Sequence, residues 1–206
     1  MYPEALTEKG RELFPLLRSF ADFYLAGGTA LALQIGHRVS ADFDLFSDRE
    51  IPHDLFSETK KVFAGREIAL SVRNPDELTI FVDGIKATFL HYPFPVLGEK
   101  VLLDGLAILS VPEIAATKAY TIGRRGSFKD YADLYFILSG QHASLADIAD
   151  LAKKKYGGEF NGRLFLEQLL WLDDLADTEI IFLKPAVDKN QIKRLFEEKI
   201  RELRIE

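Results

Sequence analysis

Two aspartates, Asp42 and Asp44, are the residues of this sequence best suited to chemistry. They lie two apart in a segment, ADFDLF, in which polar and apolar side chains alternate as in a half-buried strand. Residues two apart in a strand project from the same face, so we expect the two carboxylates to lie together. Such oxygen ligands suit Mg²⁺, which commonly shares its coordination shell with substrate phosphates. Two such ions, roughly 3.5–4 Å apart, would stabilise the attacking and leaving oxygens of a phosphoryl displacement.

A glycine pair upstream, Gly27-Gly28, could supply the phosphate-binding surface that this chemistry needs. It follows an apolar run at residues 23–26 and precedes a segment rich in Ala and Leu at residues 29–35. This order predicts a buried strand, a tight turn and a short helix. Glycines let phosphate approach the backbone closely, and the free amides of a helix N-terminus bind anions. Gly-Gly alone is usually a turn and Asp-x-Asp alone a solvated strand face, but together they predict a nucleotide-phosphate site.

The elements that must position these residues follow from periodicity and turn signals. The front half reads as α/β and the back half as helical, which predicts an α/β core at residues 1–110 and a helical subdomain at residues 111–206. The predicted helices cover residues 1–20, 29–35, 52–63, 112–125, 127–138, 144–156, 162–172 and 188–203. The predicted strands cover residues 23–26, 42–46, 67–73, 78–82 and 85–90. Asp83-Gly84 joins the last two strands as a hairpin turn, and Ser127 can cap the helix that follows it.

The motifs resemble those of a known group of enzymes. The glycine pair, thirteen further residues and then the run DFDL at residues 42–45 resemble the signature of the DNA polymerase β-type nucleotidyltransferase superfamily. The longer text, GGTALAL followed by HRVSADFD, is similar to the AbiEii/AbiGii toxin family within it. Lys118 and the run KDYADLY at residues 129–135 resemble the later motifs of that family. The resemblance covers residues 20–140.

The resemblance implies an α+β fold, with a small mixed sheet forming the nucleotidyltransferase core and a helical C-terminal half. It implies Mg²⁺ (or Mn²⁺) as cofactor and transfer of a nucleoside monophosphate from an NTP. Some family members act on tRNA ends as toxins that a separately encoded antitoxin opposes. The predicted catalytic residues are Asp42, Asp44, Lys118 and Asp130, of which the first two are the predicted metal ligands. The predicted phosphate-binding residues are Gly27, Gly28, Thr29, Arg38 and Ser40.

One position departs from the superfamily pattern. Many of these enzymes carry a third carboxylate on a neighbouring strand, whereas the run IKATFL at residues 85–90 contains no acid. Thr88 occupies the corresponding position, and we hypothesise that Asp130 lies beside Asp42 and Asp44 and partly replaces the missing acid. Two alternatives stay open: a catalytically inactive nucleotide-binding or interaction protein of the same fold, or a metal-dependent phosphodiesterase that uses water as nucleophile.

The later motif residues also have plain structural readings. Lys118 lies in an Ala-rich helix, where it could be a solvated surface lysine instead of a cation on the NTP phosphates. Asp130 lies in the first turn of a helix, where the helix dipole stabilises carboxylates. Arg124, Arg125 and Lys129 form the best candidate for a local basic patch that binds tRNA or other RNA.

Composition sets the broader limits. The chain carries 26 Lys and Arg against 32 Asp and Glu, a net charge of −6, which argues against unspecific coating of nucleic acid. It has no cysteine, which excludes disulfides and thiolate metal sites. We see no signal peptide and no apolar run of the ~20 residues that cross a bilayer, so we expect a cytoplasmic protein with no membrane partner.

Overall fold

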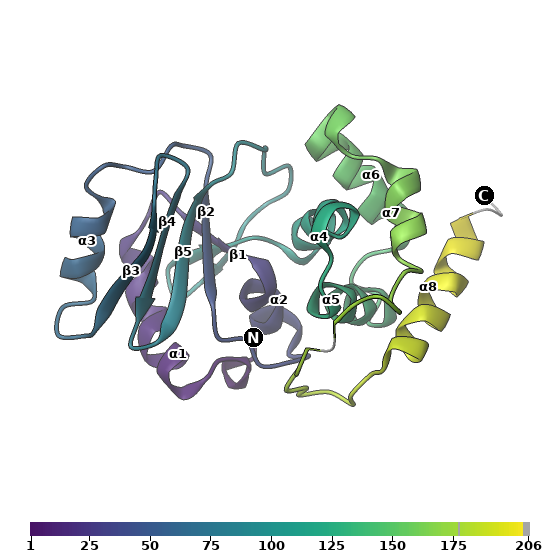
Figure 1. The fold of residues 1–206 in the computed structure, drawn as a ribbon, viewed down its shortest axis with the longest axis horizontal. Helices are drawn as coiled ribbons and strands as arrows, with labels where there is room; N and C mark the ends of the chain where they lie inside the picture. Colours follow the sequence, from purple (N-terminus) through teal and green to yellow (C-terminus); the bar gives the residue numbers. More distant parts are fainter. Residues whose placement is uncertain (177, 204–206) are drawn as a thin grey trace. The chain divides into compact units, whose positions relative to one another are not determined.

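The computed structural model describes residues 1–176 and 178–203, except for the side chain of Arg125 (Figure 1). The chain divides into two compact units. Unit 1 comprises Met1–Pro95 and Glu99–Ser110, and unit 2 comprises Val96–Gly98 and Val111–Glu206. The aspartate and glycine motifs belong to unit 1, whereas Lys118 and Asp130 belong to unit 2.

Unit 1 is built on a seven-stranded sheet in the order β3-β4-β5-β2-β1-β7-β6. β2 pairs with β5, and β1 with β7, in parallel, and the other neighbours are antiparallel. The small mixed sheet expected from the sequence is therefore confirmed. The strands are β1 (Tyr24–Ala26), β2 (Phe43–Ser47), β3 (Ile68–Arg73), β4 (Glu77–Val82), β5 (Ile85–His91), β6 (Val101–Leu103) and β7 (Leu106–Ile108).

The helices of unit 1 are short. They are α1 (Glu8–Leu13), α2 (Gly27–Ile35) and α3 (Leu55–Val62), together with 3₁₀ turns at Pro3–Ala5 and Phe14–Ser19. The continuous helix predicted over the first twenty residues is wrong. Pro15 lacks the N–H that an α-helix needs at this position, and its ring clashes with the preceding turn, so the chain changes to 3₁₀ geometry after Leu13.

The two faces of the sheet differ in character. On one face, the buried Phe89 ring of β5 packs edge-on against Phe20 at a centroid distance of 4.8 Å. Phe20 also contacts Phe63 at the end of α3, with centroids 5.9 Å apart, so aromatic packing closes this face. Side chains alternate along a strand, so Thr88, next to Phe89, lies on the opposite face. Thr88 and its register partner Asp44 therefore lie on the second face.

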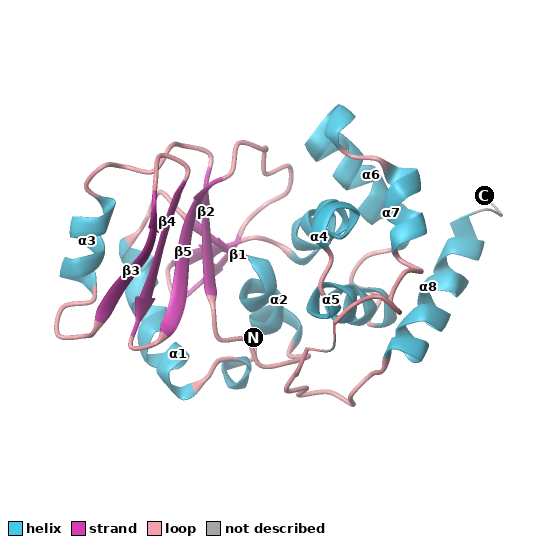
Figure 2. Cartoon of the chain, in the orientation of Figure 1, coloured by secondary structure: helices cyan, strands magenta, loops and turns pink. Residues whose placement is uncertain are grey.

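Unit 2 consists of helices joined by loops (Figure 2). They are α4 (Val111–Arg125), α5 (Phe128–Ser139), α6 (Leu145–Tyr156), α7 (Gly162–Gln168) and α8 (Lys189–Leu203), with a 3₁₀ turn at Gly157–Glu159. Ser127 caps α5 as predicted, and the core is apolar, with Leu134, Phe165 and Phe196 fully buried. None of the helices within residues 1–176 and 178–203 combines the length and the hydropathy of a membrane-spanning segment.

A buried ion pair ties residues 96–98 to unit 2. The Glu113 carboxylate on α4 accepts a 2.5 Å hydrogen bond from Lys155 of α6, and both side chains are almost fully buried. Its other oxygen accepts the backbone N–H groups of Leu97 at 2.6 Å and Gly98 at 2.8 Å. The carboxylate is thus satisfied on both oxygens, as a buried charge must be.

Candidate active site

The predicted strand-to-helix turn is present at Gly27 and lies against Asp44. β1 ends at Ala26, whose register partner on β2 is Asp44, and α2 begins at the next residue. Gly27 has a positive φ of 68°, and a Cβ at this position would overlap the Asp44 Oδ2 atom and lie 3.2 Å from its Cγ. Only glycine therefore allows the carboxylate to approach the first turn of α2 this closely. A carboxylate and a helix N-terminus come together at this point.

The hydroxyl of Thr29 connects the glycine motif to the aspartate motif. It lies in the first turn of α2, is buried, and donates to the backbone carbonyl of Asp42. It also lies 2.8 Å from the Ser40 hydroxyl. The backbone N–H of Ser40 donates to the Ala5 carbonyl at 2.8 Å. Thr29 and Ser40 thus hold the segment that enters β2. Their assignment as phosphate ligands stays a prediction.

Arg38 is placed differently from a surface phosphate ligand. The side chain is 4% exposed, and its Nη1 donates to the neighbouring Val39 carbonyl at 3.2 Å. His37 beside it is fully buried. A phosphate contact by Arg38 stays a prediction, and it would require the ligand to reach a guanidinium that is enclosed by the protein.

The two aspartates fit the donor set of a Mg²⁺ or Mn²⁺ ion. β2 begins at Phe43, one residue later than predicted, so Asp42 lies just before the strand and is exposed, while Asp44 within it is half-buried. In the described part of the chain, no group of three or more acidic or histidine side chains could hold a metal. An ion held by this pair would therefore take its remaining ligands from substrate phosphates and water, as Mg²⁺ commonly does.

Thr88 lies where the sequence places it, beside Asp44. The two residues are register partners on the parallel strands β5 and β2, so their side chains share one face. Thr88 is 8% exposed, and its hydroxyl lies 3.3 Å from that of Thr79 on β4. The Thr79 hydroxyl in turn donates to the Glu77 carboxylate at 2.6 Å. Sequence reasoning identified Thr88 but missed Glu77 and Thr79, because only the strand register shows that they are its neighbours.

In unit 2, Lys118 forms a buried double ion pair. Its Nζ lies 2.6 Å from Asp130 Oδ1 and 2.8 Å from Asp133 Oδ2. These two ion pairs join α4 to α5. Burial alone would lower the pKa of Lys118, but the two carboxylates raise it above its usual value, so the amine stays charged. Lys118 is 8% exposed, so its alternative reading as a solvated surface lysine is wrong.

Asp130 uses both carboxylate oxygens within unit 2. Oδ1 accepts from Lys118, while Oδ2 accepts the N–H of Ser127 at 3.0 Å and its hydroxyl at 2.8 Å. This is the capping arrangement expected for an acid in the first turn of a helix. A position beside Asp42 and Asp44, which belong to unit 1, stays a prediction.

The proposed basic patch is partly engaged in local contacts. The Arg124 guanidinium lies over the Tyr120 ring at 4.0 Å and within 3.5 Å of the Glu159 carboxylate. Lys129 is exposed, and the side chain of Arg125 lies outside the described residues. RNA binding by this patch stays a prediction.

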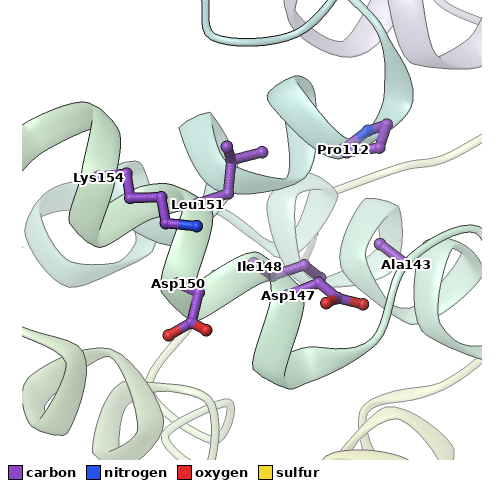
Figure 3. A pocket seen from close by; sticks show the side chains of 7 residues that line it. All are labelled: Pro112, Ala143, Asp147, Ile148, Asp150, Leu151 and Lys154. Atoms are coloured by element: carbon purple, nitrogen blue, oxygen red, sulfur yellow. The ribbon is translucent and has the colours of Figure 1, made fainter.

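A pocket of about 250 Å³ lies in unit 2 along α6, lined by Asp147, Asp150 and Lys154 together with Pro112, Ala143, Ile148 and Leu151 (Figure 3). Asp147 serves as a cap, because its carboxylate accepts the Ser144 hydroxyl at 2.6 Å. The seven labelled lining residues include none of the predicted site residues, so this pocket is separate from them.

Comparison with known proteins decides the family. A family model described as the nucleotidyl transferase AbiEii toxin of a type IV toxin–antitoxin system matches residues 11–67 and 70–204. The chain belongs to the AbiEii family. An uncharacterized protein of Aquifex aeolicus (strain VF5) is 34% identical over 183 residues, covering 88% of this chain and 87% of that protein. The family resemblance inferred from the motifs is therefore confirmed, and the chain is a nucleotidyltransferase.

Solved structures share the AbiEii-family fold. MenT4, a nucleotidyltransferase toxin from Mycobacterium tuberculosis H37Rv, matches with a TM-score of 0.64 and 18% identity over 93% of this chain and 80% of that chain. JHP933 from Helicobacter pylori matches with a TM-score of 0.58 and 17% identity over 97% of this chain and 95% of that chain. At 17% and 18% sequence identity, this structural similarity establishes a shared fold alone.

The close approach at Gly27 makes a testable prediction for this AbiEii-family protein. Gly27→Ala should lower the transfer rate by about a hundredfold, because the added methyl displaces Asp44 and small displacements of reacting groups carry such costs. Gly65→Ala is the matched control, since its φ is +83° with nothing within 4 Å of the added Cβ. Both variants should lose about 1–2 kcal/mol of unfolding free energy from the left-handed backbone. Equal activities of the two variants would contradict a role for this contact.

Proposed function

We propose that this chain transfers a nucleoside monophosphate from an NTP to tRNA, as the toxin of a toxin–antitoxin pair. Membership of the AbiEii family supports nucleotide transfer and an antitoxin as protein partner. The acceptor and the metal are part of the proposal. NTP and tRNA meet in the cytoplasm, so we place the reaction there.

The observation that carries the proposal is the apposition of Asp44 and the first turn of α2. The first N–H groups of a helix have no partner inside the helix, and together with the helix dipole they bind anions. Ala26, at the N-cap, has no side-chain oxygen that could accept from these groups. A triphosphate could thus lie on the α2 amides while a cation shared with Asp42 and Asp44 neutralises its charge.

Each residue of this site would have a distinct task. Asp42 and Asp44 would hold Mg²⁺ or Mn²⁺, which, when bound, supplies charge neutralisation at the reacting phosphate. Gly27 and Gly28 would let the phosphates approach the backbone. Thr29 would keep α2 and the entry to β2 in a fixed relation through its contact with the Asp42 carbonyl.

The reaction itself is a displacement at the α-phosphorus of the NTP. An acceptor hydroxyl oxygen forms the new bond to that phosphorus, the bond to the β-phosphate bridging oxygen breaks, and pyrophosphate leaves. The hydroxyl proton must pass to a base on the protein or to water. Positioning of the phosphates and the acceptor supplies most of what the protein contributes to such a transfer.

Unit 2 residues enter the proposal through the family resemblance. We assign Lys118 and Asp130 to the catalytic set, with Lys118 as a cation for the NTP phosphates. Its Nζ is held between Asp130 and Asp133, so a phosphate would have to replace one of these carboxylates. Lys129 and Arg124 are the residues proposed to contact acceptor phosphates, and the −6 net charge means that such contacts must be local.

Incubation with total tRNA, Mg²⁺ and each ribonucleoside triphosphate labelled at the α-phosphate tests the proposal. We expect label on tRNA with at least one NTP, and loss of labelling when EDTA removes the metal. Release of nucleotide fragments from RNA without NTP would instead support a metal-dependent phosphodiesterase. Binding of Mg²⁺ and NTP without any product would support the inactive alternative.

A further inference from the structure

Three polar side chains form a hydrogen-bonded row across the sheet in unit 1. Glu77 and Thr79 are two apart on β4 and share a face, and the Glu77 carboxylate accepts the Thr79 hydroxyl at 2.6 Å. Thr79 and Thr88 are register partners on the antiparallel strands β4 and β5, with their hydroxyls 3.3 Å apart. The row thus leads from a carboxylate at the start of β4 to the strand beside the aspartate motif.

The row ends beside Asp44. Thr88 and Asp44 are register partners on β5 and β2, and neighbouring strands lie about 4.8 Å apart, so the two side chains project side by side from the same face of the sheet. Thr79 is 2% exposed and Thr88 is 8% exposed, whereas Glu77 is half-buried. The two hydroxyls are therefore shielded, while the carboxylate at the far end reaches solvent.

The number of hydrogens on each group determines which one donates in each hydrogen bond of the row. A hydroxyl has one hydrogen, and a carboxylate only accepts, so Thr79 donates its hydrogen to Glu77. Thr88 must then donate to Thr79 across the 3.3 Å contact, which leaves the lone pairs of the Thr88 oxygen to accept from a group beside Asp44. An incoming acceptor hydroxyl is such a group.

We propose that Glu77 receives the proton of the acceptor hydroxyl through Thr88 and Thr79. The inference rests on the proposed function. As the acceptor oxygen bonds to the α-phosphorus, its proton moves to Thr88, the Thr88 proton to Thr79, and the Thr79 proton to Glu77. Pyrophosphate leaves with the bonding electron pair, and Glu77 then releases the proton to water. Glu77 is a positioning residue that acts through the two threonines.

Paired variants separate proton transfer from structural support. Glu77→Gln keeps an oxygen that accepts from Thr79 but cannot take a proton, so it should fold normally and lower kcat about a hundredfold, with KM for the NTP unchanged. Thr88→Val keeps the shape but removes the hydroxyl, and should be equally slow, whereas Thr88→Ser should restore the rate. Combining Glu77→Gln with Thr88→Val should cost little more than either change alone, because both interrupt one path.

The measurement is the rate of tRNA labelling, with thermal unfolding to check the fold and solvent deuterium to count moving protons. Wild type should show a curved dependence of rate on the deuterium fraction, and Glu77→Gln should not. Asp76→Asn is the control, because this neighbouring acid is 72% exposed and pairs with His91. Wild-type kcat in Glu77→Gln and Thr88→Val, in a preparation where Asp44→Asn is inactive, would contradict proton transfer to Glu77 but not the proposed function. No labelling by wild type would contradict the proposed function, and proton transfer to Glu77 with it.

Discussion

Replacing Asp44 with asparagine should lower nucleotide transfer at least about a thousandfold while leaving the fold intact. A thousandfold corresponds to about 4 kcal/mol in the activation barrier, within the several kcal/mol that a bound metal contributes. Asparagine keeps the size of the side chain that lies against Gly27 but removes the charge that would hold the cation. Labelling of tRNA measures the rate, and thermal unfolding measures the fold. Asp42→Asn should behave in the same way.

The control for this change is Asp48→Asn. Asp48 follows the end of β2 and is exposed, so it shares the segment but not the turn at Gly27. Its replacement should leave the transfer rate within about twofold of wild type, as surface changes distant from a site usually do. A near-wild-type rate in Asp44→Asn at saturating Mg²⁺ would remove the assignment of this aspartate.

The second large effect concerns stability. Lys118→Met should lower the free energy of unfolding by about 3–5 kcal/mol, because it removes the positive charge that pairs with the fully buried carboxylate of Asp133. The pKa of Lys118 is raised in the folded state. The ion pair therefore contributes fully below the unfolded value of 10.5 and loses its contribution only as pH rises through the folded pKa.

Urea unfolding at neutral pH measures this effect. Lys129→Met removes an exposed lysine nearby and should change the unfolding free energy by less than about 0.5 kcal/mol. Equal stability of the two variants would show that the contact with Asp133 contributes little. Loss of transfer in Lys118→Met beyond the loss of folded protein would support its catalytic assignment as well.

Local signals predicted much of the fold. Asp83 and Gly84 have positive φ values of 50° and 85°, as their hairpin turn requires, and Ser127 caps α5. The pair β6 and β7 was missed, although Asp104-Gly105 carries the same turn signal, because strands of three residues show too little alternation. The strand order was not predictable, since the placement of β2 between β5 and β1 depends on contacts distant in sequence.

The candidate site was likewise predictable from the sequence only in part. The turn at Gly27 and the aspartates of the β2 segment follow from neighbouring residues, so the sequence predicts them. The pairing of Thr79 with Thr88, and of Thr88 with Asp44, depends on register across the strands β4, β5 and β2, which no local pattern contains. The double ion pair of Lys118 likewise requires α4 and α5 to pack together.

One measurement tests the central claim most directly: transfer from a single active NTP carrying either an α- or a γ-phosphate label, with wild type and Asp44→Asn in parallel. Nucleotidyl transfer at the Asp42 and Asp44 site predicts α-label in tRNA, γ-label only in released pyrophosphate, and one pyrophosphate for each nucleotide added. Asp44→Asn should give neither product. Incorporation of γ-label into RNA, or α-label transfer that persists in Asp44→Asn, would contradict the account.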